Sequence, residues 1–517
     1  MSRAPSEVRN QPQNSISPRT RAERTDYRET STYADVLLFI DSLRGRSELA
    51  FGTIGKTTQG REIPYVIASR PRVSTPAEAR ALGRPIVYVQ GNIHAGEVEG
   101  KEALLAMLRD LTSPGRTEYL DKLILIAVPI YNADGNEKFA PQEVNRTEQN
   151  GPEMVGERPN AQGLDLNRDY IKAEAPETRA SLAMFQAWDP DVFVDLHTTD
   201  GSFHGYALTY SGSLNPAAPL GVFTRDVILP TLRSRMRSRG FETFDYGNFV
   251  SEDTVSKGWE TFDARPRFGT NYYGLRGGIS ILSEAYSHDP FKRRVESTYA
   301  FVDEILKLVS ERGTSIRSTT SLSIASVPIR SRVIAAPTPV DVIVERMDRT
   351  GDSSRTQPGV PKGVRRSGKF ETIRMPVFDR FEPTLFAARP PAYAIAASEH
   401  EAVAVLRTHG IIVTPLAVTS TARADRFVVD SAIVAPRLFQ KHHEVQLTGR
   451  WVTEQRELRA GTYIVRTTQP LGLLAVYLLE PQTDDGIVTW NLFDEAMVFG
   501  SSYPVLRVMS EPHPVAQ

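Results

Sequence analysis

The stretch PIVYVQGNIHAGEVEGKEALLAML, residues 85–108, decides how this chain folds. It opens with an apolar run at 85–90, which is typical of a strand buried on both faces of a sheet. A glycine-rich loop follows, and then Leu104, Leu105 and Leu108 recur at helical spacing. A strand, a loop and a helix in this order predict an α/β fold. The loop also carries His94 and, three residues later, Glu97.

The same alternation of apolar runs and helical patterns extends from about residue 33 to about residue 312. Buried strands are predicted at 85–90, 123–130, 191–197 and 278–285. One helix should open at Pro176, and a long helix striped by Phe291, Val295 and Val302 should close this part. We predict an α/β domain at residues 31–314, with a mixed, mostly parallel sheet and helices on both faces.

The rest of the chain has a different sequence pattern. From Ser315 onwards β-branched runs predominate, which predicts a smaller β-rich α+β accessory domain at residues 315–517. Within it, RMDRTGDSSRTQPGVPKGVRRSGKF is rich in turn-forming residues, so we expect a mobile segment near 346–370. Residues 1–30 are polar and carry several arginines, and we expect a disordered tail there.

Composition excludes several classes of protein. The formal net charge is −1 over 517 residues, so no nucleic-acid partner is expected. No apolar run reaches the roughly 18 residues that span a membrane. The chain has no cysteine, which leaves histidine and carboxylates as the strong metal ligands. The N-terminus lacks the apolar centre of a signal peptide, so the chain as written is expected to be cytoplasmic, or extracytoplasmic if a leader has been removed.

Ionisable residues follow three of the predicted strands. His94 and His197 come at the ends of two strands and Glu284 at the end of a third, where open α/β sheets place their ligand crevice. A histidine and an acid spaced by three occur about once by chance in this composition, so position rather than spacing favours a site over two polar residues in a turn. Catalytic zinc takes three histidine or carboxylate ligands and keeps one position for water. His94, Glu97 and His197 form such a set, and Glu284 remains to take a proton from water.

The segment ERPNAQGLDLNRDY, residues 157–170, adds Arg158, Asn167 and Arg168. Arginine grips a carboxylate through two parallel hydrogen bonds and polarises a carbonyl in a dry site. Beside an activated water, these residues suit hydrolysis of an amide next to a free carboxylate. The alternative for this segment is a surface loop with ordinary salt bridges.

Four motifs together resemble the zinc carboxypeptidase family: HAGE (94–97), RPNAQGLDLNR (158–168), DLH (195–197) and SEA (283–285). They occur in the family's order, and the resemblance covers about residues 33–312. It implies a zinc-dependent metallocarboxypeptidase, a hydrolase with one zinc ion per chain. Such an enzyme cleaves the C-terminal peptide bond of peptides or proteins that carry a free C-terminal carboxylate.

The resemblance also implies a role for each matching residue. His94, Glu97 and His197 would bind zinc, and Glu284 would be the general base. Arg158 would polarise the scissile carbonyl and stabilise the oxyanion. Asn167 and Arg168 would hold the terminal carboxylate of the substrate. Asp165 would accept a hydrogen bond from His94 and fix its orientation.

Some features stay open at this point. The family usually has a tyrosine that closes over the substrate, and Tyr272 and Tyr273 both lie upstream of Glu284. Other polar residues near the motifs are interpreted as pocket-lining or structural, and two in the second domain as strand or loop residues: Asp200, His204, His288, His442 and His443.

Two alternative functions also remain. A zinc amidase or deacylase of the same fold would act on N-acyl amino acids or cell-wall peptides. A catalytically inactive peptidase-like module would only bind, and the presence of Glu284 argues against it. The sequence does not indicate an oligomeric state.

Overall fold

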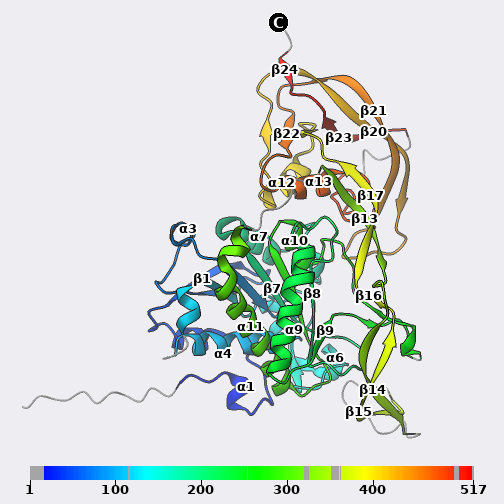
Figure 1. Cartoon of the computed structure of the whole chain (residues 1–517). Helices are drawn as coiled ribbons and strands as arrows, with labels where there is room; N and C mark the ends of the chain where they lie inside the picture. Colours follow the sequence, from blue (N-terminus) through cyan, green and yellow to red (C-terminus); the bar gives the residue numbers. More distant parts are fainter. Residues whose placement is uncertain are drawn as a thin grey trace, which may run out of the picture.

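A computed structural model describes residues 17–113, 117–252, 254–318, 325–350, 360, 362–493 and 500–514. The chain forms a larger lobe around a central sheet and a β-rich lobe beside it, with β20 and β21 at the far end (Figure 1). The expected α/β domain with a β-rich C-terminal region is confirmed. The expected boundary at residue 315 falls inside α11 (Phe291–Ser318), the last helix of the larger lobe.

The central sheet has eight strands within the part of the chain that the structure describes. In spatial order they are β1 (Leu49–Lys56), β2 (Glu62–Ala68), β4 (Ile124–Val128), β3 (Ile86–Gly91), β7 (Val192–Thr198), β12 (Ile279–Ala285), β8 (Leu208–Gly212) and β9 (Thr243–Asp245). The four strands at its centre, β4, β3, β7 and β12, run parallel, as their unbroken apolar sequences predicted. Their carboxyl ends therefore meet at one edge of the sheet.

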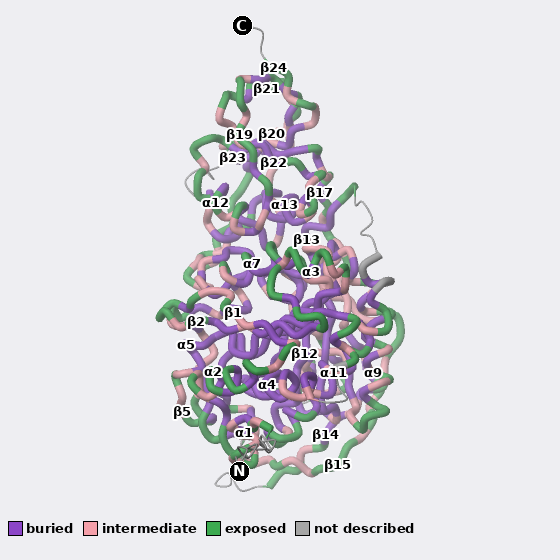
Figure 2. Tube along the Cα trace, turned by 90° about the vertical axis from the view of Figure 1, so that its left-hand side faces the viewer, coloured by how far each residue is buried: buried purple, intermediate pink, exposed green. Residues whose placement is uncertain are grey.

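Helices cover both faces of this sheet. One face carries α2 (Tyr33–Ser42), α4 (Glu99–Leu111), α9 (Leu229–Ser238) and α11; the other carries α3 (Pro76–Leu82), α7 (Pro176–Trp188) and α10 (Gly269–Leu275). Alternate residues of each strand serve the two faces, so that Val87 and Val89 pack against one layer and Tyr88 against the other. Buried segments gather around β12 in the middle of the lobe (Figure 2). Within the described ranges, no helix combines the length and apolarity needed to cross a membrane.

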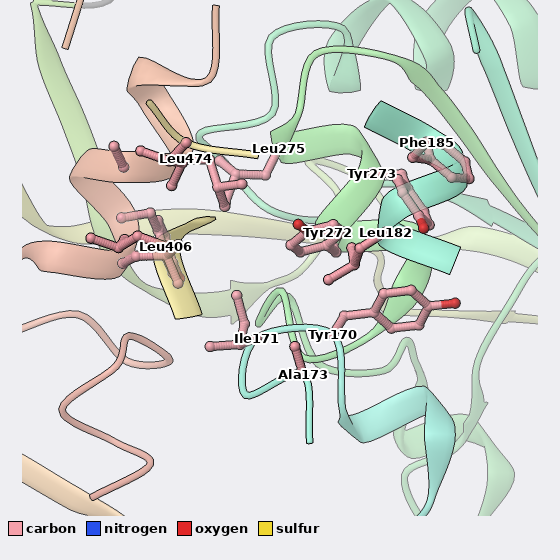
Figure 3. Close-up of a cluster of buried hydrophobic side chains, with 14 of the residues drawn as sticks. Tyr170, Ile171, Ala173, Leu182, Phe185, Tyr272, Tyr273, Leu275, Leu406 and Leu474 are labelled. Carbon is pink, nitrogen blue, oxygen red and sulfur yellow. The ribbon is translucent and has the colours of Figure 1, made fainter. Parts of the chain in front are cut away.

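The β-rich lobe is built on a second sheet. Its strands, in spatial order, are β19 (Thr414–Pro415), β22 (Tyr463–Arg466), β18 (Ala392–Ile395), β23 (Ser502–Val508), β20 (Ser420–Val434) and β21 (Val445–Leu458), with β24 (His513–Pro514) paired to β20. Two helices, α12 (His400–Thr408) and α13 (Gly472–Leu479), lie between this sheet and the larger lobe. Their residues Leu406 and Leu474 belong to the same buried cluster as Tyr272 and Leu275 of α10 (Figure 3). One hydrophobic core thus joins the two lobes.

The two ends of the segment expected to be mobile near 346–370 lie in the strands of a hairpin, and its mobility stays a prediction. β14 (Val340–Arg349) pairs with β15 (Val364–Met375), and residues 351–359 and 361 lie outside the described residues. The hairpin runs down along the larger lobe (Figure 1), and β16 (Val377–Phe378) pairs with β11 (Trp259–Glu260). Glu345 is buried between Tyr286 and Arg366, both of which donate to its carboxylate, at 3.2 and 2.8 Å. The carboxylate of Glu345 thus links the two strands of the hairpin and ties the hairpin to the larger lobe.

The tail predicted as disordered is structured from residue 17, and residues 1–16 lie outside the described residues. Thr20 caps α1 (Arg21–Arg24) through a capping box with Glu23. Arg109 of α4 donates to Glu23 Oε2 at 2.7 Å, and the backbone N–H of Ser31 donates to Glu102 at 2.6 Å. These contacts to a distant helix order the segment, and no local pattern signals them.

Candidate metal centre

The candidate ligands lie at the carboxyl ends of the parallel strands. His94 and Glu97 occupy the loop that follows β3, and His197 is near the end of β7. The loop is shaped by Asn92, which has a left-handed backbone (φ 65°) and donates to the carbonyls of Ala95 and Glu97 at 3.1 and 3.3 Å. Local hydrogen bonds therefore turn the chain so that both side chains face β7.

The three side chains converge on one point. His94 Nδ1 lies 3.0 Å from Glu97 Oε1, and His197 Nδ1 lies 2.9 Å from Glu97 Oε2 and 3.2 Å from His94 Nδ1. Among the residues that the structure describes, this is the one group of histidine and acidic side chains arranged to hold a metal ion. All three are buried, with 3 % exposure each.

Two aspartates settle which ring nitrogens face the centre. Asp165 Oδ1 lies 3.0 Å from His94 Nε2, and Asp195 Oδ2 lies 3.0 Å from His197 Nε2. A carboxylate acceptor favours the tautomer with a proton on Nε2, which leaves the Nδ1 lone pair free. Two lone pairs and one carboxylate that face each other in a buried site repel without a cation between them. The donor set therefore fits zinc, which prefers histidine and carboxylate ligands.

The charge on Glu97 is held by its surroundings. Burial alone would raise the pKa of this carboxyl, but His94, Arg146 and His197 outweigh burial and hold the pKa well below its usual value. Arg146 Nη1 donates to Glu97 Oε1 at 3.1 Å, and its Nη2 donates to the carbonyl of Thr199 at 3.0 Å. A Cβ at Gly96 would come within 2.6 Å of Arg146, so glycine makes room for this arginine. Glu97 is thus ionised, as a carboxylate that binds a metal ion must be.

Glu284 stands beside the ligands without joining them. It lies on β12, and the parallel pairing with β7 sets it in register with His197. Burial raises the pKa of its carboxyl well above the usual value, and the nearby charges of Glu97 and Asp200 add to this shift, while His197 and Arg146 oppose it. A buried carboxyl with a high proton affinity next to a metal centre can take up a proton and release it again.

Residues 157–170, here called the arginine loop, contribute Arg158, Asn167 and Arg168 to the lining of the same cleft. Arg158 donates from Nε to Asp165 Oδ2 at 3.0 Å, and its Nη1 lies 3.5 Å from Glu97 Oε1. The guanidinium of Arg168 lies over the ring of Phe268, 4.0 Å from its centroid. Asn167 accepts a hydrogen bond from the backbone N–H of Gly269 at 2.8 Å. These contacts fix two guanidinium groups so that cationic N–H donors face the cleft.

All seven site residues predicted from the sequence line one cleft. Their roles in catalysis stay predictions at this point. The further lining residues are Arg146, Thr198, Asp200, Tyr246, Phe262, Phe268, Thr270 and Leu282.

The structure places both candidate tyrosines away from this cleft. Tyr272 and Tyr273 are buried in α10, and their hydroxyls contact His409 Nδ1 and Ser181 at 2.7 and 3.0 Å. Tyr246 reaches the cleft instead and donates to Asp200 at 3.1 Å. It comes from a loop after β9, whose neighbourhood carries no motif that would have singled it out.

Sequence reasoning also missed two partners of the ligands. Asp195 lies two residues before His197 on the same face of β7, so strand periodicity could have found it. Arg146 lies in a loop that has no comparable signal.

The other histidines lie outside the metal group. His204 is buried and forms an isolated bridge with Val344 of the β14–β15 hairpin, and burial lowers its pKa to about 3. His288 stacks on Phe203, with ring centroids 4.2 Å apart. His442 lies in the loop between β20 and β21 and contacts Glu174 Oε1 at 2.8 Å. Of the polar residues set aside in the sequence, Asp200 is thus the one that lines the cleft.

This chain is similar in sequence to several known proteins. Residues 39–217 match the family model described as zinc carboxypeptidase. Carboxypeptidase 2 of Trichophyton rubrum is 22% identical over 488 residues, which cover 90% of this chain and 84% of the relative. Human carboxypeptidase D is 34% identical over 134 residues, 25% of this chain and 9% of that protein. A solved structure, the metallo-carboxypeptidase of Pseudomonas aeruginosa in complex with (2-guanidinoethylmercapto)succinic acid, has 18% identity and a TM-score of 0.41, covering 55% of this chain and 70% of the other.

Proposed function

We propose roles for the cleft residues of this chain, which carries a domain of the zinc carboxypeptidase family and is a zinc-dependent metallocarboxypeptidase. His94, Glu97 and His197 hold the zinc ion. Bound there, zinc lowers the pKa of a water molecule and polarises a carbonyl oxygen. The observation that carries the proposal is the convergence of two Nδ1 atoms and one carboxylate, with Glu284 next to them.

Glu284 is the proton carrier. Its carboxylate takes a proton from the attacking water and passes the same proton to the amine nitrogen that leaves. Burial and the charges of Glu97 and Asp200 raise the pKa of Glu284, which brings its proton affinity closer to the working pH and suits both halves of this transfer. Its register with His197 places it beside the metal ligands, on the face of β12 that lines the cleft.

Arg158 stabilises the oxygen on which negative charge develops. Its guanidinium is held by Asp165 at 2.9 Å and lies next to Glu97, so an N–H is available beside the metal centre. A fixed cationic donor in a partly dry cleft stabilises an oxyanion more than a mobile one in water. Since Asp165 fixes the guanidinium of Arg158 before the reaction, the side chain need not move when the carbonyl is attacked.

Arg168 and Asn167 bind the C-terminal carboxylate of the peptide. Arg168 stacks on Phe268 and donates from Nη1 to the carbonyl of Asn167 at 2.9 Å, so its guanidinium is fixed and its other N–H groups can bind a carboxylate. Recognition at this point limits cleavage to the last peptide bond, because Asn167 lies beside the metal ligands, with its Nδ2 3.5 Å from His197 Nε2. An N-acyl amino acid carries the same carboxylate, so the amidase alternative uses the same residues.

Hydrolysis of matched peptides tests the proposal. Each peptide is offered with a free and with an amidated C-terminus, with and without a zinc chelator. We expect release of one residue from the free peptides alone, and loss of that release with the chelator. Equal cleavage of amidated peptides would contradict the role of Arg168 and Asn167. Cleavage confined to N-acyl amino acids would favour the amidase alternative.

A further inference from the structure

A turn of the β-rich lobe contacts Asp165, the carboxylate that holds His94 and Arg158. Between β20 and β21, Phe439 and His442 pair with each other through two backbone hydrogen bonds of 2.8 and 3.0 Å. Gln440 and Lys441 form the two-residue tip between them. Although this tip is about 275 residues from the arginine loop in sequence, Gln440 Oε1 accepts a hydrogen bond from the backbone N–H of Asp165 at 2.8 Å.

The backbone of this tip is in a conformation that its residues disfavour. Gln440 has φ 49° and Lys441 has φ 71°, both in the left-handed region. A two-residue hairpin of this kind favours Asn-Gly or Gly-Gly, because glycine adopts positive φ without a steric penalty. Neither Gln440 nor Lys441 is a glycine or an asparagine. A conformation that is locally unfavourable persists where the surroundings impose it, and such positions cluster at functional sites.

Contacts of His442 and Glu444, which follow the tip, hold it against the larger lobe. His442 Nε2 lies 2.8 Å from Glu174 Oε1, and its Nδ1 lies 2.8 Å from Asn491 Oδ1. Two residues further on, Glu444 forms an ion pair with Arg267 of the larger lobe, which also donates to the buried Asp485 at 2.9 Å. Since His442 and Glu444 lie close to the tip in sequence, their contacts with Glu174 and Arg267 fix the position of Gln440 relative to Asp165.

Asp165 is the residue through which this contact reaches the metal. Its Oδ1 lies 3.0 Å from His94 Nε2, and its Oδ2 accepts from Arg158 Nε at 3.0 Å. A shift of its backbone therefore moves a metal ligand and the oxyanion donor together. We propose that Gln440 is a positioning residue, which sets the place of Asp165 and through it the orientation of His94 and Arg158.

Glycine substitutions separate the hydrogen bond from the strained turn. Gln440→Gly relieves the unfavourable φ and removes the acceptor, whereas Lys441→Gly relieves the neighbouring φ and leaves the acceptor in place. Gln440→Glu keeps an oxygen that can accept the same N–H. The three variants are compared with wild type for Tm, for kcat and KM on a C-terminally free peptide, and for the zinc affinity of the apoprotein by competition with a chelator.

We expect Lys441→Gly to have a Tm at or above that of wild type, with unchanged kinetics and zinc affinity. Gln440→Gly should keep its Tm, yet lose about 5- to 20-fold in zinc affinity and in kcat/KM, chiefly through kcat, because an unpaired N–H and a displaced outer partner weaken the ligand set. Gln440→Glu should lie closer to wild type than to Gln440→Gly. Zinc affinity and kcat in Gln440→Gly equal to those of Lys441→Gly would overturn the proposal.

The activity part of this inference rests on the proposed peptidase function, but the zinc part does not. If wild type cleaved no peptide while Gln440→Gly still bound zinc more weakly, the proposed function would fail and the positioning role would stand. If wild type and both glycine variants cleaved peptides equally and bound zinc equally, the positioning role alone would fail.

Discussion

Glu284 faces His197 across two parallel strands, because β12 and β7 pair these residues in register. In the proposed mechanism, this relationship sets the proton carrier Glu284 beside the metal ligand His197 without making Glu284 a ligand. Exchange of the carboxylate for an amide of the same size should therefore remove the proton transfer and spare the metal. Glu284→Gln should lower kcat/KM by about 10²- to 10⁴-fold, the usual contribution of a positioned general base.

Peptide hydrolysis and the zinc content of the purified variant test this prediction together. Ser283→Ala is a matched control, because residue 283 is also buried in β12 but points to the opposite face. Near wild-type hydrolysis by Glu284→Gln with zinc bound would exclude Glu284 as the base.

Asp195 should control how tightly the site binds zinc. It lies 3.0 Å from His197 Nε2 and is fully buried, so it selects the tautomer that leaves Nδ1 free for the metal. Asp195→Asn offers an amide group that can stabilise the other tautomer. We expect zinc affinity to fall about 10- to 100-fold, as for other outer partners of metal-bound histidines. Chelator competition on the apoprotein measures this, and an unchanged affinity would refute it.

The cleft should prefer an apolar C-terminal side chain. Leu282 lies two residues before Glu284 on the same face of β12, and Phe262 and Phe268 line the same cleft with ring centroids 5.2 Å apart. Asp200, the acidic residue at the rim, already accepts hydrogen bonds from Tyr246 and Asn248, each at 3.1 Å. Peptides ending in leucine or phenylalanine should exceed those ending in aspartate by at least about 10-fold in kcat/KM.

Leu282→Ala should reduce that discrimination, since the pocket then loses apolar contact with the side chain. The peptide panel with a free C-terminus gives both values. A preference for peptides ending in lysine or arginine would show that Asp200 rather than Leu282 determines specificity.

The pair formed by His442 and Glu174 should make stability depend on pH. The hydrogen bond to Glu174 raises the pKa of His442 against the effect of burial. Burial opposes the shift at Glu174, but His442 and Lys172 outweigh it and lower the pKa of Glu174 to about 2. The stability contributed by Glu174 is fully present above the pKa of glutamate in the unfolded chain. It is lost as pH falls towards the lowered pKa of Glu174 in the folded protein. The stability contributed by His442 is fully present below the pKa of histidine in the unfolded chain. It is lost as pH rises through the raised pKa of His442 in the folded protein.

The pair is therefore strongest between about pH 4.5 and 6.5, the window between the two unfolded pKa values. His442→Ala should lower the free energy of unfolding by a few tenths to about 1 kcal/mol in this window, as for other partly exposed pairs, and by less at pH 8.5. Denaturant unfolding at both pH values measures the difference. His443→Ala is a matched control on an exposed neighbour. If His442→Ala lowered the free energy of unfolding more at pH 8.5 than between about pH 4.5 and 6.5, the pH dependence predicted for the His442–Glu174 pair would be contradicted.

Residues at strand ends could be predicted because their placement follows from local pattern. The apolar runs identify β3, β7 and β12 as buried parallel strands, and parallel strands end at one edge of a sheet. The side chains at these strand ends then lie close together, however the connecting helices pack. They are those of His94, Glu97, His197 and Glu284. The arginine loop was found in the same way, through a motif of consecutive residues.

Other contacts depend on segments that are far apart in sequence, and only the tertiary structure decided them. Arg146 reaches Glu97 from a loop, Tyr246 rather than Tyr272 or Tyr273 enters the cleft, and Gln440 touches Asp165 from another lobe. Arg109 of α4 holds Glu23 of the N-terminal segment, and Tyr286 donates to Glu345 of the β14–β15 hairpin; composition reveals neither contact. Periodicity reports which face of an element is buried, but not which distant chain segment covers it.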